Sequence, residues 1–316
     1  MDINRCLSSL TLRFFFAGKL MEIIRSAAAM QGFAEAERCR GRVIVFVPTM
    51  GYFHSGHLDL MRIGRKLGDC LVVSIYVNPV QFAPTEDFDA YPRDFERDRR
   101  LAETAGVDLI FNPDNREMYP EGYQTYVKVE GVTNNLCGLS RPDFFRGVTT
   151  VCTKLFHIVK PHVTIFGKKD FQQYVTIKRM VRDLNMDIEV VGMDTTRESD
   201  GLAMSSRNVY LKPEERESAL SLSRSLVLAG ELYAKGERNS AHILKNVCSL
   251  IARYPHTEID YARICDATTM KDVERIEDEC VLALAVRVGK TRLIDNRIFG
   301  EALDIGQKDC SRMQGD

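Results

Sequence analysis

Two histidines three positions apart, His54 and His57, are the side chains whose types and spacing first suggest chemistry. They follow the apolar run 43–47 and precede the segment 58–65, whose pattern is that of a starting helix. Because the first N–H groups of a helix are unpaired and its dipole is positive at that end, such a turn attracts anions. Gly56 between the histidines would let a phosphate approach the backbone closely. The turn therefore predicts a phosphate site with imidazole donors.

Other polar side chains also follow apolar runs. Asn78 and Gln81 come after the run 71–77, and Lys169 and Asp170 come after a later one. Strands that alternate with helices form a parallel sheet, and ligands bind such sheets at the carboxyl ends of the strands. We therefore expect these four side chains to lie at one edge of a sheet, together with the two histidines.

A polar segment of small residues, 197–208, ends this alternation. Within it the range 204–207 supplies two hydroxyls and a guanidinium, which suit a triphosphate, and Lys169 adds a compact positive charge. The two commonest nucleotide signatures, the Walker loop and Gly-x-Gly-x-x-Gly, are absent. We expect the segment to be a mobile loop between two domains that faces the histidine turn.

The predicted strands and helices that must position these groups alternate along the chain. This alternation indicates an α/β protein with a doubly wound, parallel, Rossmann-like sheet. We expect an N-terminal extension (1–19), the sheet domain (20–197) and a smaller C-terminal α+β domain (198–316) that closes over the sheet as a lid. The tail beyond residue 300 has the composition of a poorly ordered segment. The apolar patterns predict strands at 43–47, 71–77, 107–111, 126–129 (an edge strand), 162–166, 188–191, 258–265, 280–288 and 291–294, and helices at 20–38, 57–67, 94–105, 147–159, 170–183, 213–234 and 240–253.

Composition narrows the class of protein. A net charge of −1 with 28% charged residues argues against a nucleic-acid or membrane surface as the main partner. Nine scattered cysteines without a Cys-x-x-Cys pair indicate neither a disulfide framework nor a zinc site, so we expect a reducing, cytoplasmic location. Residues 1–19 are basic and apolar, which fits either an organelle transit peptide or an amphipathic segment that leans on the sheet domain. The charged segment 94–100 is most simply a solvated helix face.

Six blocks of this sequence, in this order, resemble the pantothenate synthetase (pantoate–β-alanine ligase) family. The likeness extends over about residues 20–298, whereas His-x-Gly-His alone would indicate only the wider superfamily of adenylyltransferases and class I aminoacyl-tRNA synthetases. The blocks are 48–57 (Pro-Thr-Met-Gly to His), 77–82 (Val-Asn-Pro-Val-Gln-Phe), 141–148 (Arg-Pro-Asp-Phe-Phe-Arg-Gly-Val), 166–173 (Phe-Gly-Lys-Lys-Asp-Phe-Gln-Gln), 200–208 (Asp-Gly-Leu-Ala-Met-Ser-Ser-Arg-Asn) and 291–296 (Thr-Arg-Leu-Ile-Asp-Asn).

The resemblance implies a two-step, ATP-dependent reaction. The pantoate carboxylate attacks the α-phosphorus of ATP to give pantoyl adenylate and pyrophosphate, and the amine of β-alanine then displaces AMP to give pantothenate. It also implies Mg²⁺ bound with ATP and a homodimer. Two alternatives remain open: an adenylyltransferase that leaves AMP on its product, and a catalytically silent nucleotide-binding protein.

By resemblance, His54, His57 and Lys169 are catalytic, with His57 the candidate proton donor. Gln81 and Gln173 would hold pantoate, Gln81 would also meet β-alanine, and Asn78 would support this pocket. Lys168 stands where an acidic residue is frequent in the family, and Phe171 where tyrosine is usual. No metal ligand is assigned, although the acidic residues at 86–98 could help to position Mg²⁺. The implied ATP contacts are Met50, Gly51, His54, His57, Gly167, Lys168, Lys169, Asp170, Thr196, Met204, Ser205, Ser206 and Arg207.

Overall fold

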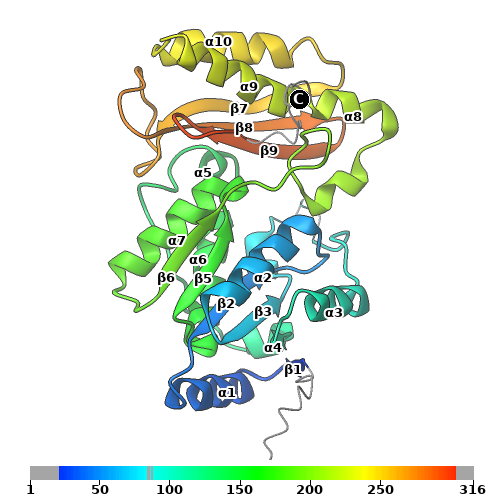
Figure 1. Cartoon of the computed structure of the whole chain (residues 1–316), viewed down its shortest axis with the longest axis vertical. Coiled ribbons are helices and arrows are strands. Elements are labelled where there is room, and N and C mark those ends of the chain that lie inside the picture. Colours follow the sequence, from blue (N-terminus) through cyan, green and yellow to red (C-terminus); the bar gives the residue numbers. More distant parts are fainter. Residues whose placement is uncertain (1–20, 84–85, 87, 304–316) are drawn as a thin grey trace, which may run out of the picture.

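A six-stranded, entirely parallel sheet forms the centre of the larger part of the molecule (Figure 1). The computed structural model describes residues 21–83, 86 and 88–303. Strand order reverses between β2 and β5, and at such a switch point the carboxyl ends of the strands open a crevice for ligands. The doubly wound fold is therefore confirmed. In sheet order the strands are β1 (Glu22–Ile24), β4 (Leu109–Phe111), β3 (Cys70–Ile75), β2 (Ile44–Thr49), β5 (Val163–Gly167) and β6 (Glu189–Met193).

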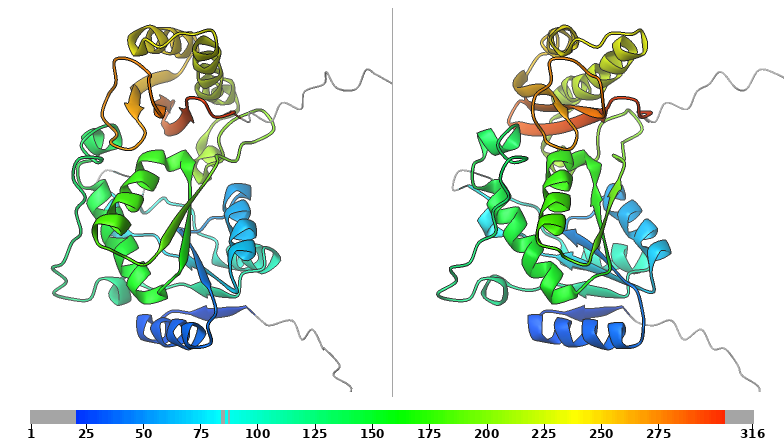
Figure 2. Two further views of the ribbon diagram at one scale, coloured as in Figure 1. Left: turned by 60° about the vertical axis from the view of Figure 1, so that its left-hand side comes forward. Right: turned by 90° about the vertical axis from the view of Figure 1, so that its left-hand side faces the viewer.

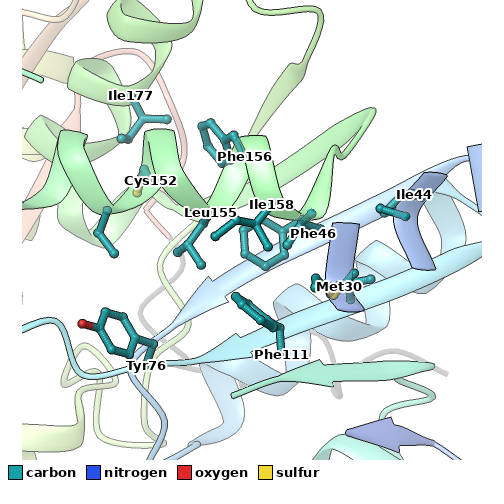
Figure 3. Packing of buried hydrophobic residues seen from close by; sticks show 14 of the residues in the cluster. Met30, Ile44, Phe46, Tyr76, Phe111, Cys152, Leu155, Phe156, Ile158 and Ile177 are labelled. Carbon is teal, nitrogen blue, oxygen red and sulfur yellow. The ribbon is translucent and has the colours of Figure 1, made fainter. Parts of the chain in front are cut away.

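Helices cover both faces of this sheet, because its central strands are apolar on both sides. On one face lie α1 (Ala27–Cys39), α6 (Phe144–Val159) and α7 (Phe171–Asp183), and on the other α2 (Ser55–Leu67) and α3 (Phe95–Thr104). Figure 3 shows Phe46 of β2 among Leu155 and Phe156 of α6, and the two phenyl rings meet edge to face with centroids 6.4 Å apart. Full burial of one such ring stabilises the fold by about 1.5–3 kcal/mol. Shorter helical turns connect these elements: η1 (Pro79–Gln81), α4 (Asn115–Met118), α5 (Cys137–Ser140) and η2 (Lys168–Asp170).

The smaller part is a three-stranded antiparallel sheet with helices on one face. Figures 1 and 2 show it seated over one end of the larger part, with α9 and α10 on the far side of its sheet. Its elements are η3 (Ser206–Tyr210), α8 (Pro213–Ala219), α9 (Ser221–Ala234), α10 (Ser240–Ile251), β7 (Thr257–Asp266), β8 (Cys280–Val288) and β9 (Thr291–Ile298).

The two parts share a hydrophobic cluster. Leu136 and Phe171 of the larger part pack with Met270, Val281 and Ile298 of the smaller part, and each of these side chains is at most 6% exposed. A lid that swung away as a whole would expose this apolar surface to water, which is unfavourable. Closure about this interface is therefore restrained to movements that keep the cluster packed.

Three predicted elements differ from the structure. The helix expected at 20–38 is divided, because Ile23 and Ile24 pair with β4 and the Ser26 side chain then caps α1. The expected edge strand at 126–129 is an extended segment that pairs with no strand; instead its Val127 backbone bonds the hydroxyls of α6. The helix expected at 213–234 is broken at Leu220 into α8 and α9. The expected N-terminal extension and the tail beyond residue 303 lie outside the described residues.

Candidate active site

A cleft of about 970 Å³ lies between the carboxyl edge of the parallel sheet and the smaller part. It brings together the polar groups that follow β2, β3 and β5, and it places the segment 204–207 with them. Gly51 and Lys168 are the two predicted site residues that do not line it. The predicted residues that do are Met50, His54, His57, Asn78, Gln81, Gly167, Lys169, Asp170, Gln173, Thr196, Met204, Ser205, Ser206 and Arg207.

A buried carboxylate fixes the turn that leads into the histidines. Gly51 and Tyr52 both have positive φ, at 83° and 51°, a conformation that side chains other than glycine rarely adopt. Asp98 of α3, which is 1% exposed, accepts the Tyr52 N–H at 2.6 Å and the Phe53 N–H at 2.7 Å. Such charge-assisted bonds offset the strain of the turn. The prediction of a solvated face for 94–100 is thus wrong at Asp98, which lies on the apolar stripe of its helix.

The two imidazole rings lie against each other, with centroids 4.0 Å apart. The backbone N–H of His54 donates to Nδ1 of the His57 ring at 3.3 Å, so neutral His57 must carry its proton on Nε2. Burial and the positive charge of Lys169 lower both pKa values, that of His54 to about 4 and that of His57 well below its usual 6.5. Both rings are therefore neutral at pH 7. His57 can donate a hydrogen bond through Nε2, whereas the protonated imidazolium form is disfavoured there.

The lowered pKa of His54 predicts a specific acid sensitivity. Unfolded His54 binds a proton near pH 6.5 and folded His54 only near pH 4, so stability is lost as pH falls through this window. Between pH 7 and pH 5 we expect the ligand-free protein to lose about 2 kcal/mol more free energy of unfolding than His54→Gln. Urea unfolding of both proteins at the two pH values measures this difference, and parallel losses would contradict it.

The two neighbouring lysines of η2 have different surroundings. The Lys169 side chain is 18% exposed, and its amine lies 3.8 Å from Asp170 while facing the histidine turn closely enough to lower both imidazole pKa values. The Lys168 amine instead pairs with Asp194 at 3.0 Å and Glu301 at 3.5 Å, and Lys168 itself does not line the cleft. Lys169 is therefore the cation of this turn that can meet a phosphate in the cleft.

An amide network orients Gln81. Buried Asn78 donates to Gln81 Oε1 at 3.2 Å and to the Gly147 carbonyl at 3.1 Å, and its own oxygen accepts the Tyr119 hydroxyl at 2.9 Å. The Gln81 amide nitrogen consequently points toward Met50, whose sulfur is 3.0 Å away. This leaves an N–H donor in the cleft. Gln173 of α7 lines the same cleft.

Gly147 is required for this arrangement, because η1 packs directly on α6. A Cβ at position 147 would lie 2.6 Å from the Val80 carbonyl and 2.7 Å from Gln81 Cα. We expect Gly147→Ala to destabilise the protein by about 1–3 kcal/mol, because the added methyl would displace Gln81 and η1. Gly32→Ala in α1, where the added methyl meets nothing within 4 Å, is the matched control and should stabilise slightly. Thermal unfolding distinguishes the two variants, and equal behaviour would contradict the requirement for glycine at position 147.

The segment 204–207, for which we expect a mobile loop, makes several contacts with its surroundings, and its mobility stays a prediction. The Met204 N–H donates to the Thr196 carbonyl at 2.9 Å, and the Ser205 hydroxyl accepts the Arg207 N–H at 3.3 Å. The Arg207 guanidinium lies over the ring of Tyr91, 5.7 Å from its centroid, and Tyr91 is itself buried. Ser206 and Arg207 are thus held at the wall of the cleft before any ligand binds.

Supporting residues were missed by sequence reasoning, and one of them carried a usable signal. Phe95, Asp98, Ala102 and Ala105 follow helical spacing, so Asp98 is a carboxylate on an apolar stripe. A charge in that position is buried and needs partners. Tyr91 and Gly147 carry no comparable signal, since their partners are distant in sequence.

Comparison with known proteins identifies the family. The family model described as pantoate-beta-alanine ligase matches residues 22–298. A pantothenate synthetase of Syntrophus aciditrophicus is 67% identical over 285 residues, which are 90% of this chain and 100% of the relative, and one of Geobacter sulfurreducens is 57% identical over 89% of this chain and 99% of the relative.

Solved structures of the same family are also similar to this chain. The pantothenate synthetase of Thermus thermophilus is 42% identical with a TM-score of 0.83, covering 88% of this chain and 99% of that one. The ligase of Francisella tularensis, solved with Beta-gamma ATP and Beta-alanine, is 29% identical with a TM-score of 0.72, covering 88% and 97%. No helix in the described part of this chain is long and apolar enough to cross a membrane. On the match of the family model and these relatives, the chain belongs to the pantoate–β-alanine ligase family.

Proposed function

We propose that the chain joins pantoate to β-alanine in this cleft through a pantoyl-adenylate intermediate. In the first step a pantoate carboxylate oxygen attacks the α-phosphorus of ATP, and the bond to the bridging oxygen breaks to release pyrophosphate. In the second step the amine of β-alanine attacks the carbonyl carbon of the adenylate and AMP leaves. The observation that carries the proposal is that His57, Lys169, Gln81 and the 204–207 segment line one cleft.

The first step needs donors aimed at the phosphate oxygens, where negative charge accumulates. Nε2–H of His57 and the amine of Lys169 supply them from the ends of β2 and β5, and Ser206 and Arg207, which line the same cleft, supply more. Donors that are fixed before the reaction need no reorganisation as charge develops, and each is worth roughly 2.7–4 kcal/mol. Asp170 is placed to accept ribose hydroxyls. His57 acts in this scheme as a hydrogen-bond donor.

Pantoate is assigned to the amides of Gln81 and Gln173. An amide both donates and accepts, so it suits a ligand that carries hydroxyls and a carboxylate. Because Asn78 occupies Gln81 Oε1, the Gln81 amide nitrogen is directed into the cleft and can meet the pantoate carboxylate. Binding at this wall would hold that carboxylate for attack, and alignment of two reactants can supply roughly 7–11 kcal/mol of a barrier.

Gln81→Ala is expected to raise KM for pantoate about tenfold or more with little change in KM for ATP, since one directed donor to the carboxylate is lost. Initial rates at varied pantoate and at varied ATP provide the comparison. An effect on ATP alone would contradict the assignment of Gln81.

Mg²⁺ is assigned to the triphosphate. Across residues 21–83, 86 and 88–303 no group of three His, Cys, Asp or Glu side chains is arranged to hold a metal ion. The assignment rests on the chemistry of Mg²⁺, which keeps several waters and usually binds through substrate phosphates and one or two carboxylates. When bound, Mg²⁺ would neutralise phosphate charge beside Lys169.

Product analysis tests the proposal. Incubation with ATP, Mg²⁺, pantoate and β-alanine should give AMP and pantothenate in equal amounts. An adenylyltransferase would release pyrophosphate and keep AMP on its product, and a silent protein would release neither. The homodimer and the cytoplasmic location expected from the sequence remain predictions, which sedimentation and a fluorescent fusion with and without residues 1–19 would test.

A further inference from the structure

We propose that Asn296 of β9 is a positioning residue for the nucleotide site, because it holds the turn that carries Lys169. The inference makes the smaller part a structural component of ATP binding. It rests on the proposed function and extends it to a residue that the cleft chemistry does not otherwise use.

The Asn296 amide nitrogen makes two hydrogen bonds across the interface. It donates to the Lys168 carbonyl at 2.9 Å and to the Lys169 carbonyl at 2.8 Å, so both of its hydrogens are used. Asn296 is 7% exposed and lies on the face of β9 that meets the larger part, the same face as Ile298 of the shared cluster. Figure 1 shows β9 as the strand of the smaller part that lies nearest to the larger part. The backbone that presents the Lys169 side chain is thus fixed from the other part of the molecule.

Asp295, the preceding residue, holds a second segment that borders the cleft. It lies on the other face of β9 and accepts hydrogen bonds from both terminal nitrogens of Arg197, at 2.6 and 2.9 Å, and both side chains are at most 3% exposed. Arg197 also donates to the Gly201 carbonyl and pairs its backbone with Ala203. Because Thr196 and Met204 lie next in this hairpin, Asp295 positions the segment that leads to Arg207.

Two adjacent residues of one strand therefore hold two segments that line the cleft, the Lys169 turn and the hairpin that leads to 204–207. The backbone N–H of Asn296 donates to Asp295 Oδ1 at 2.9 Å. This bond ties the contact of Asp295 with Arg197 to the contact of Asn296 with the Lys169 turn. Displacement of β9 would move Lys169 and the 204–207 segment together. Asn296 is the better position to test, since removal of Asp295 would leave the Arg197 charge buried without its partner.

The test uses two variants of Asn296 in the full chain. Asn296→Ala should raise KM for ATP about tenfold, the result of losing two hydrogen bonds to the turn, with KM for β-alanine unchanged. Asn296→Asp keeps the shape of the side chain but replaces the donor by an oxygen that faces two carbonyls. A role in packing alone would be rescued by aspartate, whereas a role in donation would not. We therefore expect Asn296→Asp to bind ATP at least as weakly as Asn296→Ala, and wild-type KM for ATP in either variant would overturn the inference.

Asn135→Ala is the matched control. Asn135 also donates from its amide nitrogen across the interface, to the Met270 carbonyl at 3.0 Å and to Asp272 at 2.7 Å, but it does not touch the Lys169 turn. We expect a comparable loss in melting temperature with KM for ATP within about twofold of wild type. An equal rise in KM for ATP in this control would assign the effect to general loosening and overturn the inference. Calorimetric titration with α,β-methylene-ATP gives the same comparison without turnover, and wild-type activity measured in parallel separates failure of this inference from failure of the proposed function.

Discussion

His57→Ala is expected to lower kcat for adenylate formation by about 10²–10³-fold, as loss of one preorganised donor does. The His54 N–H fixes His57 Nδ1 as an acceptor, and the depressed pKa keeps the ring neutral, so Nε2–H is the donor that alanine removes. Single-turnover formation of pantoyl adenylate measures the change. A raised KM for ATP with unchanged kcat would mean that His57 binds ground state and transition state equally, which contradicts this role.

His162→Ala is the control for the His57 experiment. His162 is also a partly buried histidine whose Nδ1 accepts a backbone N–H, that of Ile44 at 2.9 Å, and whose pKa is lowered by burial. It lies at the amino end of β5, the end opposite to the cleft. We expect His162→Ala to lower stability and to leave kcat within about twofold of wild type. A large drop in kcat would instead show that loss of a buried histidine lowers activity by destabilising the fold.

Lys169→Met is expected to lower kcat/KM for ATP by about 10²–10³-fold and to leave the reaction of preformed pantoyl adenylate with β-alanine within a few-fold of wild type. The reason is that the amine would act on the phosphates that leave as pyrophosphate in the first step. The same substitution should also raise the pKa of His54 above 4, because the Lys169 charge is one cause of its depression. NMR titration of the imidazole provides this second readout.

Lys168→Met is the control for Lys169→Met, because it removes a positive charge from the same turn at a position that does not line the cleft. The Lys168 amine is already paired with Asp194 and Glu301, so we expect a loss in kcat/KM for ATP below about fivefold. Equal losses in the two lysine variants would contradict the assignment of Lys169 as the phosphate-binding cation.

The sequence was sufficient where a local pattern determines the structure. β2, β3 and β5 are continuous apolar runs because they are buried on both faces, and α6 keeps an apolar stripe. β1 could not be found in this way, since its three residues are extended only through pairing with β4. The break at Leu220 could not be predicted, because no proline or glycine lies next to it in the sequence.

The same distinction applies to the cleft. Its chemical groups could be predicted because histidine, lysine and glutamine stand out directly after apolar strands, and topology brings those strand ends together. The groups that hold them could not, because Asp98 reaches a turn 46 positions away and Asn296 one 127 positions away. Contacts of that separation depend on how distant elements pack against one another, within the larger part for Asp98 and between the two parts for Asn296, and no short motif encodes this.

Pyrophosphate exchange tests the central claim most directly. With ATP, Mg²⁺ and labelled pyrophosphate, the protein should incorporate label into ATP when pantoate is added and β-alanine is omitted, because the adenylate forms reversibly before the amine enters. Omission of pantoate should abolish the exchange. Exchange that requires β-alanine, or none at all from a protein that makes pantothenate, would contradict a pantoyl-adenylate intermediate in this cleft.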